Sequence, residues 1–220
     1  MKRLIIFGIG QIAEVAHYLF TEDSAFEVSG FTVDANYCDR SEHLGIPVVP
    51  FETVTEAFPP DEYSIFVAIG YGDLNKKRSA KVVEARRKGY ELASYASSRA
   101  WLWKGFRVEP NTMIMEHNTI QPYVTIGANC ILWSGNHIGH HTRIGENVFI
   151  ASHAVISGSV VVGDNSFIGV NATLRDNIVL GRDCVVGAGA LVLSDGPDKA
   201  VYPGRQTEPS LVTSDRLRSI

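Results

Sequence analysis

Histidines gather in one stretch of this chain, Trp133 to His153, which holds four of the seven: His137, His140, His141 and His153. An imidazole can accept a proton near neutral pH, so one well-placed histidine here could act as a general base. A zinc site would need three or four converging histidine or cysteine ligands. No such spacing occurs here, and the three cysteines are far apart. The stretch therefore predicts proton transfer without a metal.

An aliphatic ladder surrounds these histidines. Every sixth residue is Val, Ile or Leu, fifteen times without a break: Val108, Ile114, Ile120, Ile126, Leu132, Ile138, Ile144, Ile150, Ile156, Val162, Ile168, Leu174, Leu180, Val186 and Val192. This period fits neither an α-helix nor a simple strand, and it is typical of a hexapeptide β-helix, where three short strands make each triangular coil. Three repeats of six make 18 residues per coil, so residues 18 apart should be stacked.

Polar residues follow the same stacking rule on the early coils. His117, Gly135 and His153 form one predicted line, and Asn118 and Asn136 form another at inward corners. Such a polar edge is expected where a ligand or a second subunit docks. Because the ladder is never interrupted, no long loop leaves the coils, and the site must be built from the coil surface. The flat faces need covering, which predicts a cyclic homotrimer.

Most inward corner residues, two positions before each ladder residue, are small. Cys130 and Cys184 belong to this set, and we expect both to fill the core as buried thiols.

The first part of the chain has a different pattern. A short apolar strand, Lys2–Phe7, leads into Gly8-Ile9-Gly10-Gln11-Ile12-Ala13 and a helical pattern through Phe20. Glycines at the start of a helix let the backbone approach a phosphate. A second strand, Val28–Val33, ends at Asp34, whose carboxylate could accept a hydrogen bond from a ribose hydroxyl or from uracil N–H.

The remaining elements predicted here are short. Strands are expected at 46–49, 64–69 and 91–94, a helix at 74–88 with Asp73 as a candidate N-cap, and a hinge at 96–105. Trp101 and Trp103 of the hinge are expected to pack between the domains. The unit has one mononucleotide-binding half, whereas a dinucleotide site needs two, which argues against an NAD-dependent oxidoreductase.

Composition narrows the function classes. The 220 residues are 45% hydrophobic and 20% charged, with a net charge of −4 and no basic run, so nucleic-acid binding is not expected. No apolar run approaches a membrane span, and the chain enters a strand pattern at once without a signal peptide. We expect a cytoplasmic protein.

The ladder and the histidine stretch together resemble a known family. The ladder is similar to the left-handed β-helix acyltransferases, a fold that also hosts γ-class carbonic anhydrases and scaffold proteins. The segment Trp133-Ser134-Gly135-Asn136-His137-Ile138-Gly139-His140-His141 resembles the motif of PglD/NeuD-like sugar acyltransferases, roughly Asn-Thr-Gly-x-x-x-x-His-Asp. The resemblance implies that His140 is the general base, with His141 where the family has an acidic residue.

The resemblance also implies binding residues. A second family histidine, nine positions on, holds the acyl thioester; Phe149 stands there, so that task would pass to backbone N–H groups, Asn136 or a neighbouring subunit. Backbone along the last coils would approach the pantetheine arm of acetyl-CoA, and Arg205 would meet a CoA phosphate: Gly187, Ala188, Gly189, Ala190 and Arg205. Residues of the first domain would line a nucleotide pocket: Gly8, Gly10, Gln11, Asp34, Ala35 and Gly70.

These observations predict an α/β Rossmann-like half-domain at 1–100, a left-handed parallel β-helix of about five coils at 101–205 and a tail at 206–220. The expected activity is acetyl transfer from acetyl-CoA to the amino group of a nucleotide-linked amino sugar in bacterial glycan synthesis. His140, His141 and Asn136 are the expected catalytic residues, and Phe149 is expected to contact the cofactor. The alternatives are sugar O-acetylation of the NeuD kind and a non-catalytic nucleotide-sugar-binding scaffold.

Overall fold

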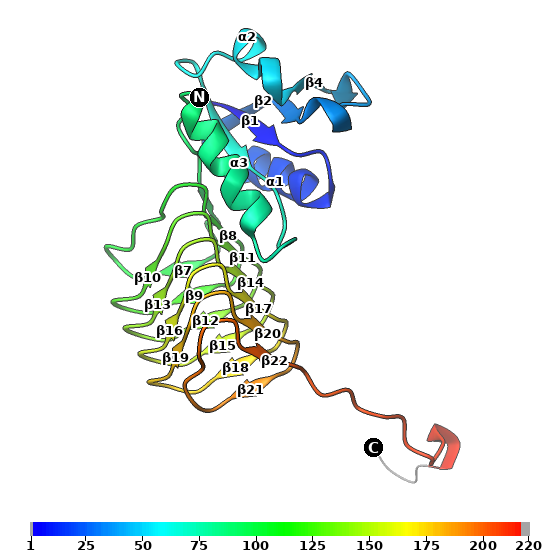
Figure 1. Ribbon diagram of the computed structural model, residues 1–220, viewed down its shortest axis with the longest axis vertical. Helices are drawn as coiled ribbons and strands as arrows, with labels where there is room; N and C mark the ends of the chain where they lie inside the picture. Colours follow the sequence, from blue (N-terminus) through cyan, green and yellow to red (C-terminus); the bar gives the residue numbers. More distant parts are fainter. Residues whose placement is uncertain (1, 217–220) are drawn as a thin grey trace.

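An α/β unit stands on the end of a triangular solenoid in the computed structural model, which describes residues 2–216 (Figure 1). The α/β unit has a five-stranded sheet in the order β3-β4-β2-β1-β5, parallel except between β3 and β4. Its strands are β1 (Lys2–Phe7), β2 (Phe26–Val33), β3 (Glu42–His43), β4 (Ile46–Pro50) and β5 (Tyr63–Val67). Its helices are α1 (Gln11–Glu22), α2 (Val54–Ala57) and α3 (Lys76–Arg87), with 3-10 turns at Ala35–Tyr37 and Phe51–Thr53.

The predicted elements of this unit are present with small shifts. The expected strand at 91–94 is reduced to one bridge between Leu92 and Ile65. Helix α3 starts at Lys76, and its N-cap is Asn75 in a left-handed conformation (φ 66°), so the Asp73 cap was wrong. The polar contacts of Asn75 with the solenoid explain the later start.

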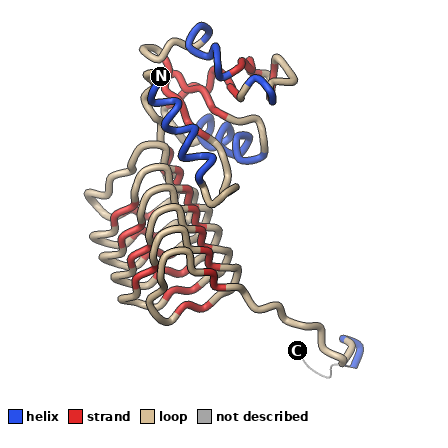
Figure 2. The backbone as a smooth tube through the Cα atoms, in the orientation of Figure 1, coloured by secondary structure: helices blue, strands red, loops and turns tan. Residues whose placement is uncertain are grey.

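The solenoid is made of two-residue strands in three parallel sheets, which we name C, D and E (Figure 2). Sheet C contains β6 (Tyr95–Ala96), β8 (Met113–Ile114), β11 (Ile131–Leu132), β14 (Phe149–Ile150), β17 (Phe167–Ile168), β20 (Val185–Val186) and β22 (Val201–Tyr202). Sheet D contains β7 (Trp101–Leu102), β9 (Thr119–Ile120), β12 (His137–Ile138), β15 (Val155–Ile156), β18 (Thr173–Leu174) and β21 (Leu191–Val192). Sheet E contains β10 (Thr125–Ile126), β13 (Arg143–Ile144), β16 (Val161–Val162) and β19 (Val179–Leu180).

The aliphatic ladder forms the solenoid core. Fourteen of its fifteen members, all except the half-buried Val108, belong to one buried cluster together with Cys130 and Cys184. Burial raises the pKa of the Cys130 thiol to about 12, so this cysteine is core filling. The predicted fold class, an α/β half-domain followed by a β-helix, is confirmed.

Strands of the solenoid begin earlier than the expected hinge. β6 pairs with β8, and β7 pairs with β9, so residues 96–105 contribute to a first coil. Trp103 packs against the solenoid core and donates its Nε1–H to Val124 O (3.3 Å), while Trp101 is 55% exposed. The expected interdomain packing of these tryptophans was therefore wrong.

A ladder of side-chain amides joins the two units. Asn111, Asn129, Asn147, Asn165 and Asp183 lie 18 residues apart at the corner between sheets E and C, each amide hydrogen-bonded to the next. At its end, Asn111 pairs with the backbone of Val67 in β5, accepting its N–H at 2.7 Å and donating to its carbonyl at 3.3 Å.

Arg78 of α3 is fully buried against this ladder. Its guanidinium donates to Asn129 and Asn147 of the solenoid and to Ile69, Gly70 and Asn75 of the α/β unit, at 3.0–3.3 Å. Burial lowers the pKa of Arg78 to about 10, so the side chain stays charged at neutral pH. This cation, held by neutral oxygens, fixes the α/β unit to sheet C and its corner with sheet E.

Candidate functional site

A cavity of about 490 Å³ lies at the carboxyl ends of β1, β2 and β5. In open α/β sheets this edge is where ligands bind. The wall residues are Phe7, Ile9, Val33, Asp34, Tyr37, Ile69, Lys77 and Lys81. Its size suits a nucleoside, since small-molecule pockets measure about 300–1,000 Å³. We call it the strand-end pocket.

Two charged groups of the strand-end pocket, Asp34 and Lys81, are paired. Lys81 Nζ lies 2.6 Å from Asp34 and 2.7 Å from Glu84. Burial lowers the pKa of Lys81, but the hydrogen bonds to Asp34 and Glu84 outweigh it, and the pKa is raised. A ligand that donates a hydrogen bond to Asp34 would therefore share its carboxylate with the Lys81 ammonium group. The same ammonium group can also bind a phosphate.

The other residues expected at the nucleotide lie around the same edge. Gly8 has φ +120°, and a Cβ there would come 3.0 Å from Ala68 O, so both conformation and space favour glycine. Gly10 is the N-cap of α1 with open space beside it. Ala35 N–H is bound by the Glu52 carboxylate, and Gly70 O accepts from Arg78. Both of these backbone groups are already occupied, and Gly8 N–H donates to Thr32 O (2.8 Å). The N–H groups of Gly10 and Gln11 have no hydrogen-bond partner among the described residues, so they are free backbone donors of this edge.

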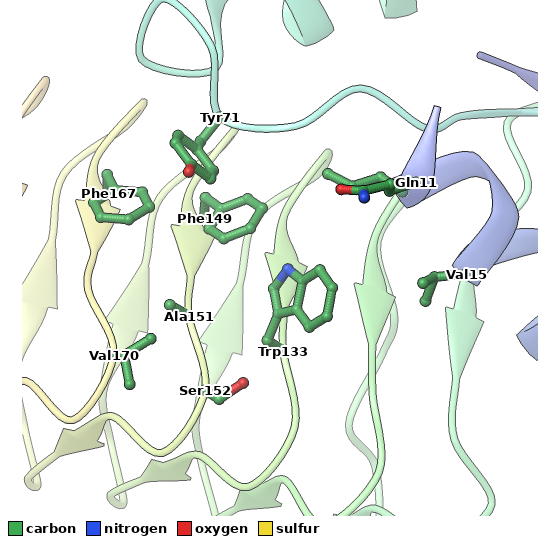
Figure 3. Close-up of a pocket in the computed structure, with 10 residues that line it drawn as sticks. Gln11, Val15, Tyr71, Trp133, Phe149, Ala151, Ser152, Phe167 and Val170 are labelled. Atoms are coloured by element: carbon green, nitrogen blue, oxygen red, sulfur yellow. The ribbon is translucent and has the colours of Figure 1, made fainter. Parts of the chain in front are cut away.

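A second cavity, of about 500 Å³, lies between α1 and sheet C (Figure 3). Its walls are mostly apolar: Gln11, Ile12, Val15, Tyr71, Trp133, Phe149, Ala151, Ser152, Phe167 and Val170. Phe149 stacks on Phe167 (5.7 Å, 19° between planes), and Tyr71 covers both at 5.0 and 4.8 Å. We call it the aromatic pocket. It contains two predicted site residues, Gln11 and Phe149, and Trp133, Tyr71 and Phe167 join them.

His140 and His141 lie at a different corner, between sheets D and E. Both are exposed, and their Nδ1 atoms are 3.1 Å apart. Gln121 Oε1 accepts the His140 backbone N–H (2.9 Å), and the His140 ring lies over Gly158, where a Cβ would come 2.7 Å from the ring. An Nδ1–Nδ1 contact of this length lets one ring donate to the other, which leaves Nε2 of His140 free for a substrate.

Asn136 lies on the corner between sheets C and D, whereas His140 is on the next corner. Asn136 is buried in the coil, donates to Trp133 O and accepts from Ala154 N at 2.8 Å. This amide therefore joins neighbouring coils.

The triangular section separates His140 from the aromatic pocket within one chain. The corner between sheets D and E lies opposite sheet C, on which the α/β unit and the aromatic pocket sit. His140 and Phe149 are nine residues apart, which is half a coil, so they are on opposite sides of the solenoid. A site that uses both must combine two copies of the chain.

A third cavity, of about 470 Å³, lies at the last coils and is lined by Gly189, Ala190, Leu191, Val201, Tyr202, Pro203 and Arg205. It brings together three of the residues expected at acetyl-CoA: Gly189, Ala190 and Arg205. Gly187 is needed for packing, because a Cβ there would lie 2.6 Å from Gly204 N. We call this the last-coil pocket.

One corner connects the last-coil and aromatic pockets. Ser152, Val170 and Ala188 are 18 residues apart on the corner between sheets C and D; the first two line the aromatic pocket, and Ala188 precedes the last-coil pocket. Stacked coils are about 4.8 Å apart, so this corner covers about 10 Å from Ser152 to Ala188. An extended ligand could lie along it with one end in each pocket.

Residues 2–216 contain neither a cluster of metal ligands nor a helix able to span a membrane. No group of three or more His, Cys, Asp or Glu side chains could hold a metal ion. No helix in this range is long and apolar enough to cross a membrane.

Fold and site together define a hexapeptide-repeat protein with a nucleotide-sized pocket in its α/β unit. A family model described as the GMPPB C-terminal domain matches residues 104–210. No curated protein is similar enough in sequence to match.

Solved structures give the closer comparison. The acetyltransferase domain of PglB from Neisseria gonorrhoeae is 21% identical, with a TM-score of 0.81 over 96% of this chain and 100% of that one. PerB from Caulobacter crescentus, solved with CoA and GDP-perosamine, is 27% identical, with a TM-score of 0.80 over 91% of this chain and 93% of that one. WeeI from Acinetobacter baumannii is 18% identical, with a TM-score of 0.78 over 91% and 96%. The chain thus matches hexapeptide-repeat sugar acetyltransferases in structure, and the predicted resemblance is confirmed.

Sequence reasoning missed three residues of the aromatic pocket. Trp133 was quoted only as part of the histidine motif, and Tyr71 and Phe167 were not singled out. The stacking rule carried a signal for Phe167, because it lies 18 residues after Phe149. Tyr71 comes from the α/β unit, and no periodicity links it to the coils.

Proposed function

We propose that this protein transfers an acetyl group from acetyl-CoA to the amino group of a nucleotide-linked amino sugar. The observation that carries the proposal is the corner between sheets C and D, which connects the last-coil pocket to the aromatic pocket beside the α/β unit. The strand-end pocket would hold the nucleotide, and CoA would lie along the corner with its phosphates near Arg205. PerB, the relative solved with CoA and GDP-perosamine, supports this pair of ligands.

In the proposed reaction the amine nitrogen attacks the thioester carbonyl carbon while Nε2 of His140 takes the proton from nitrogen. The tetrahedral intermediate then expels the CoA sulfur, which leaves as the thiol after accepting a proton. His141 would hold the His140 ring through the Nδ1–Nδ1 contact, in place of an acidic residue. Because His140 lies opposite sheet C, it would serve the pocket of a neighbouring copy in a homotrimer.

Steady-state kinetics test the general base. Acetyl-CoA would be assayed with UDP-, GDP- and dTDP-linked 4-amino sugars, and wild type compared with His140→Ala. We expect kcat to fall by about 10²–10⁴, the usual contribution of a general base. His117→Ala is the control, since this imidazole is exposed and lines none of the three pockets. A fall smaller than about tenfold would contradict the assignment of His140.

The acceptor is tested in the same assay. Matched sugars with a hydroxyl in place of the amine would reveal O-acetylation. Sugar binding without thioester cleavage would instead support a non-catalytic scaffold.

A further inference from the structure

The indole nitrogen of Trp133 is a buried donor without an acceptor. Trp133 lines the aromatic pocket, and its Nε1 has no hydrogen-bond partner among residues 2–216. Leaving a buried N–H unpaired is costly, and native proteins rarely do so without a ligand, a water molecule or a functional reason. By contrast, the indole N–H of Trp103 is paired with a backbone carbonyl.

The backbone of Trp133 is held firmly in place. Its carbonyl accepts hydrogen bonds from the buried amides of Asn118 (2.8 Å) and Asn136, and its N–H donates to Ile150 O (2.9 Å). One contact from its own coil and one from the coil on each side therefore position the residue. A donor fixed in this way needs little reorganisation when charge develops near it.

The surroundings of Trp133 favour an apolar group that carries one acceptor. Most of the wall has no side-chain hydrogen-bond donor, as at Phe149, Phe167, Ala151 and Val170. Besides the Trp133 indole, the polar side chains of the wall are Gln11, Ser152 and Tyr71. Each hydroxyl of a sugar would lose water here and need its own partner. An acyl thioester has a methyl group, a sulfur atom and a single carbonyl oxygen, which matches the wall better.

Gln11 lines the same pocket as Trp133. In Figure 3 it lies beyond the same edge of the indole that carries Nε1, and it is an exposed residue at the start of α1. Its side chain makes no hydrogen bond within the described residues.

We propose that Trp133 Nε1–H donates a hydrogen bond to the carbonyl oxygen of the acyl thioester. The bond strengthens as that oxygen gains negative charge in the tetrahedral intermediate, and it weakens again when the C–S bond breaks and the carbonyl reforms. Trp133 then acts on the acyl group while His140 of a second copy takes the proton from the amine. This inference rests on the proposed function, since it needs an acyl-CoA donor.

Trp133→Phe removes the N–H and keeps an aromatic ring. We expect kcat to fall by about 10²–10³, as for the loss of one oxyanion donor, with the KM for the nucleotide sugar changed less than threefold. Trp101→Phe is the matched control, because Trp101 is 55% exposed on sheet D, and its kcat should stay within about twofold of wild type. If Trp133→Phe and Trp101→Phe unfold at the same thermal midpoint, the lower kcat of Trp133→Phe comes from the lost N–H donor and not from loss of folding.

Binding gives a readout that does not depend on turnover. The chain has three tryptophans, so a ¹⁵N-indole-labelled sample should show three indole N–H signals, with that of Trp133 identified by its loss in Trp133→Phe. Acetyl-CoA should move the Trp133 signal downfield, and CoA, which lacks the acetyl carbonyl, should not. A shift produced by the nucleotide sugar alone would assign the donor to the sugar and overturn the proposal.

The role of Trp133 and the acetyltransferase activity can fail independently. If His140→Ala abolishes transfer while Trp133→Phe keeps wild-type kcat, the function stands and the role of Trp133 is wrong. If wild type neither cleaves acetyl-CoA nor shows an indole shift with it, both are wrong.

Discussion

Asp23 links the α/β unit to the first coil of the solenoid through hydrogen bonds. Asp23, at the end of α1, accepts hydrogen bonds from Tyr95 Oη (2.8 Å), Ser97 Oγ (3.2 Å) and Ser98 N (2.9 Å), which belong to the first coil. The backbone N–H of Ser98, with the hydroxyl partners, lowers the pKa of Asp23 from 3.8 to about 2. The carboxylate form is therefore favoured in the folded protein.

The lowered pKa of Asp23 makes the free energy of unfolding depend on pH. Asp23 contributes stability that is fully present above pH 3.8 and is lost as the pH falls towards about 2, because its folded pKa lies below its unfolded pKa. Urea unfolding should show Asp23→Asn less stable than wild type at pH 6, with the difference shrinking below pH 3.8. Asp61→Asn, at an exposed carboxylate, is the control. A difference independent of pH would contradict the role of ionised Asp23.

At the scale of residues, the sequence predicted the solenoid better than the site. The ladder spacing placed Ile138 and its equivalents in the core because hexapeptide geometry leaves one inward direction per repeat. The amide ladder from Asn111 to Asp183 obeys the same spacing and could have been found. The burial of Arg78 could not, because a basic residue on a helix is normally solvated, and its partners come from two units.

At the scale of elements, α3 and the corner between sheets E and C form the joint between the units. Arg78→Met should cost about 3 kcal/mol or more in the free energy of unfolding, since several buried oxygens lose a charged donor. The control Arg86→Met, exposed on the same helix, should change stability by no more than about 0.5 kcal/mol. Chemical denaturation of both variants measures this, and equal stabilities would show that Arg78 is not the principal link.

The element boundaries that were predicted incorrectly lie where the units meet. The first coil begins at β6, before the expected hinge, because Ala96 and Leu102 continue the six-residue spacing with smaller or half-buried side chains. The start of α3 moved to Lys76 because Asn75 is occupied by Asn165 O (3.1 Å) and Ser166 O (3.3 Å). At α3, a contact with the other unit outweighs the local pattern.

At the scale of the whole molecule, a site that uses both His140 and the aromatic pocket would need more than one chain. His140 is on the corner opposite sheet C, so no rotation of side chains within one chain brings it to the aromatic pocket. A cyclic trimer repeats one heterologous contact three times and can place this corner of each chain against the pocket of the next. Sedimentation should give three times the chain mass of 24.1 kDa.

Mixing two inactive variants tests this arrangement directly. His140→Ala removes the base and keeps the aromatic pocket, whereas Ala151→Phe keeps the base and fills the pocket, whose wall includes Ala151. If each site takes its pocket from one chain and its base from the next, random trimers formed from equal amounts should recover about a quarter of wild-type activity. Each variant refolded alone is the control and should stay inactive. No recovery in the mixture would mean that pocket and base serve the same chain, which the position of His140 opposite sheet C argues against.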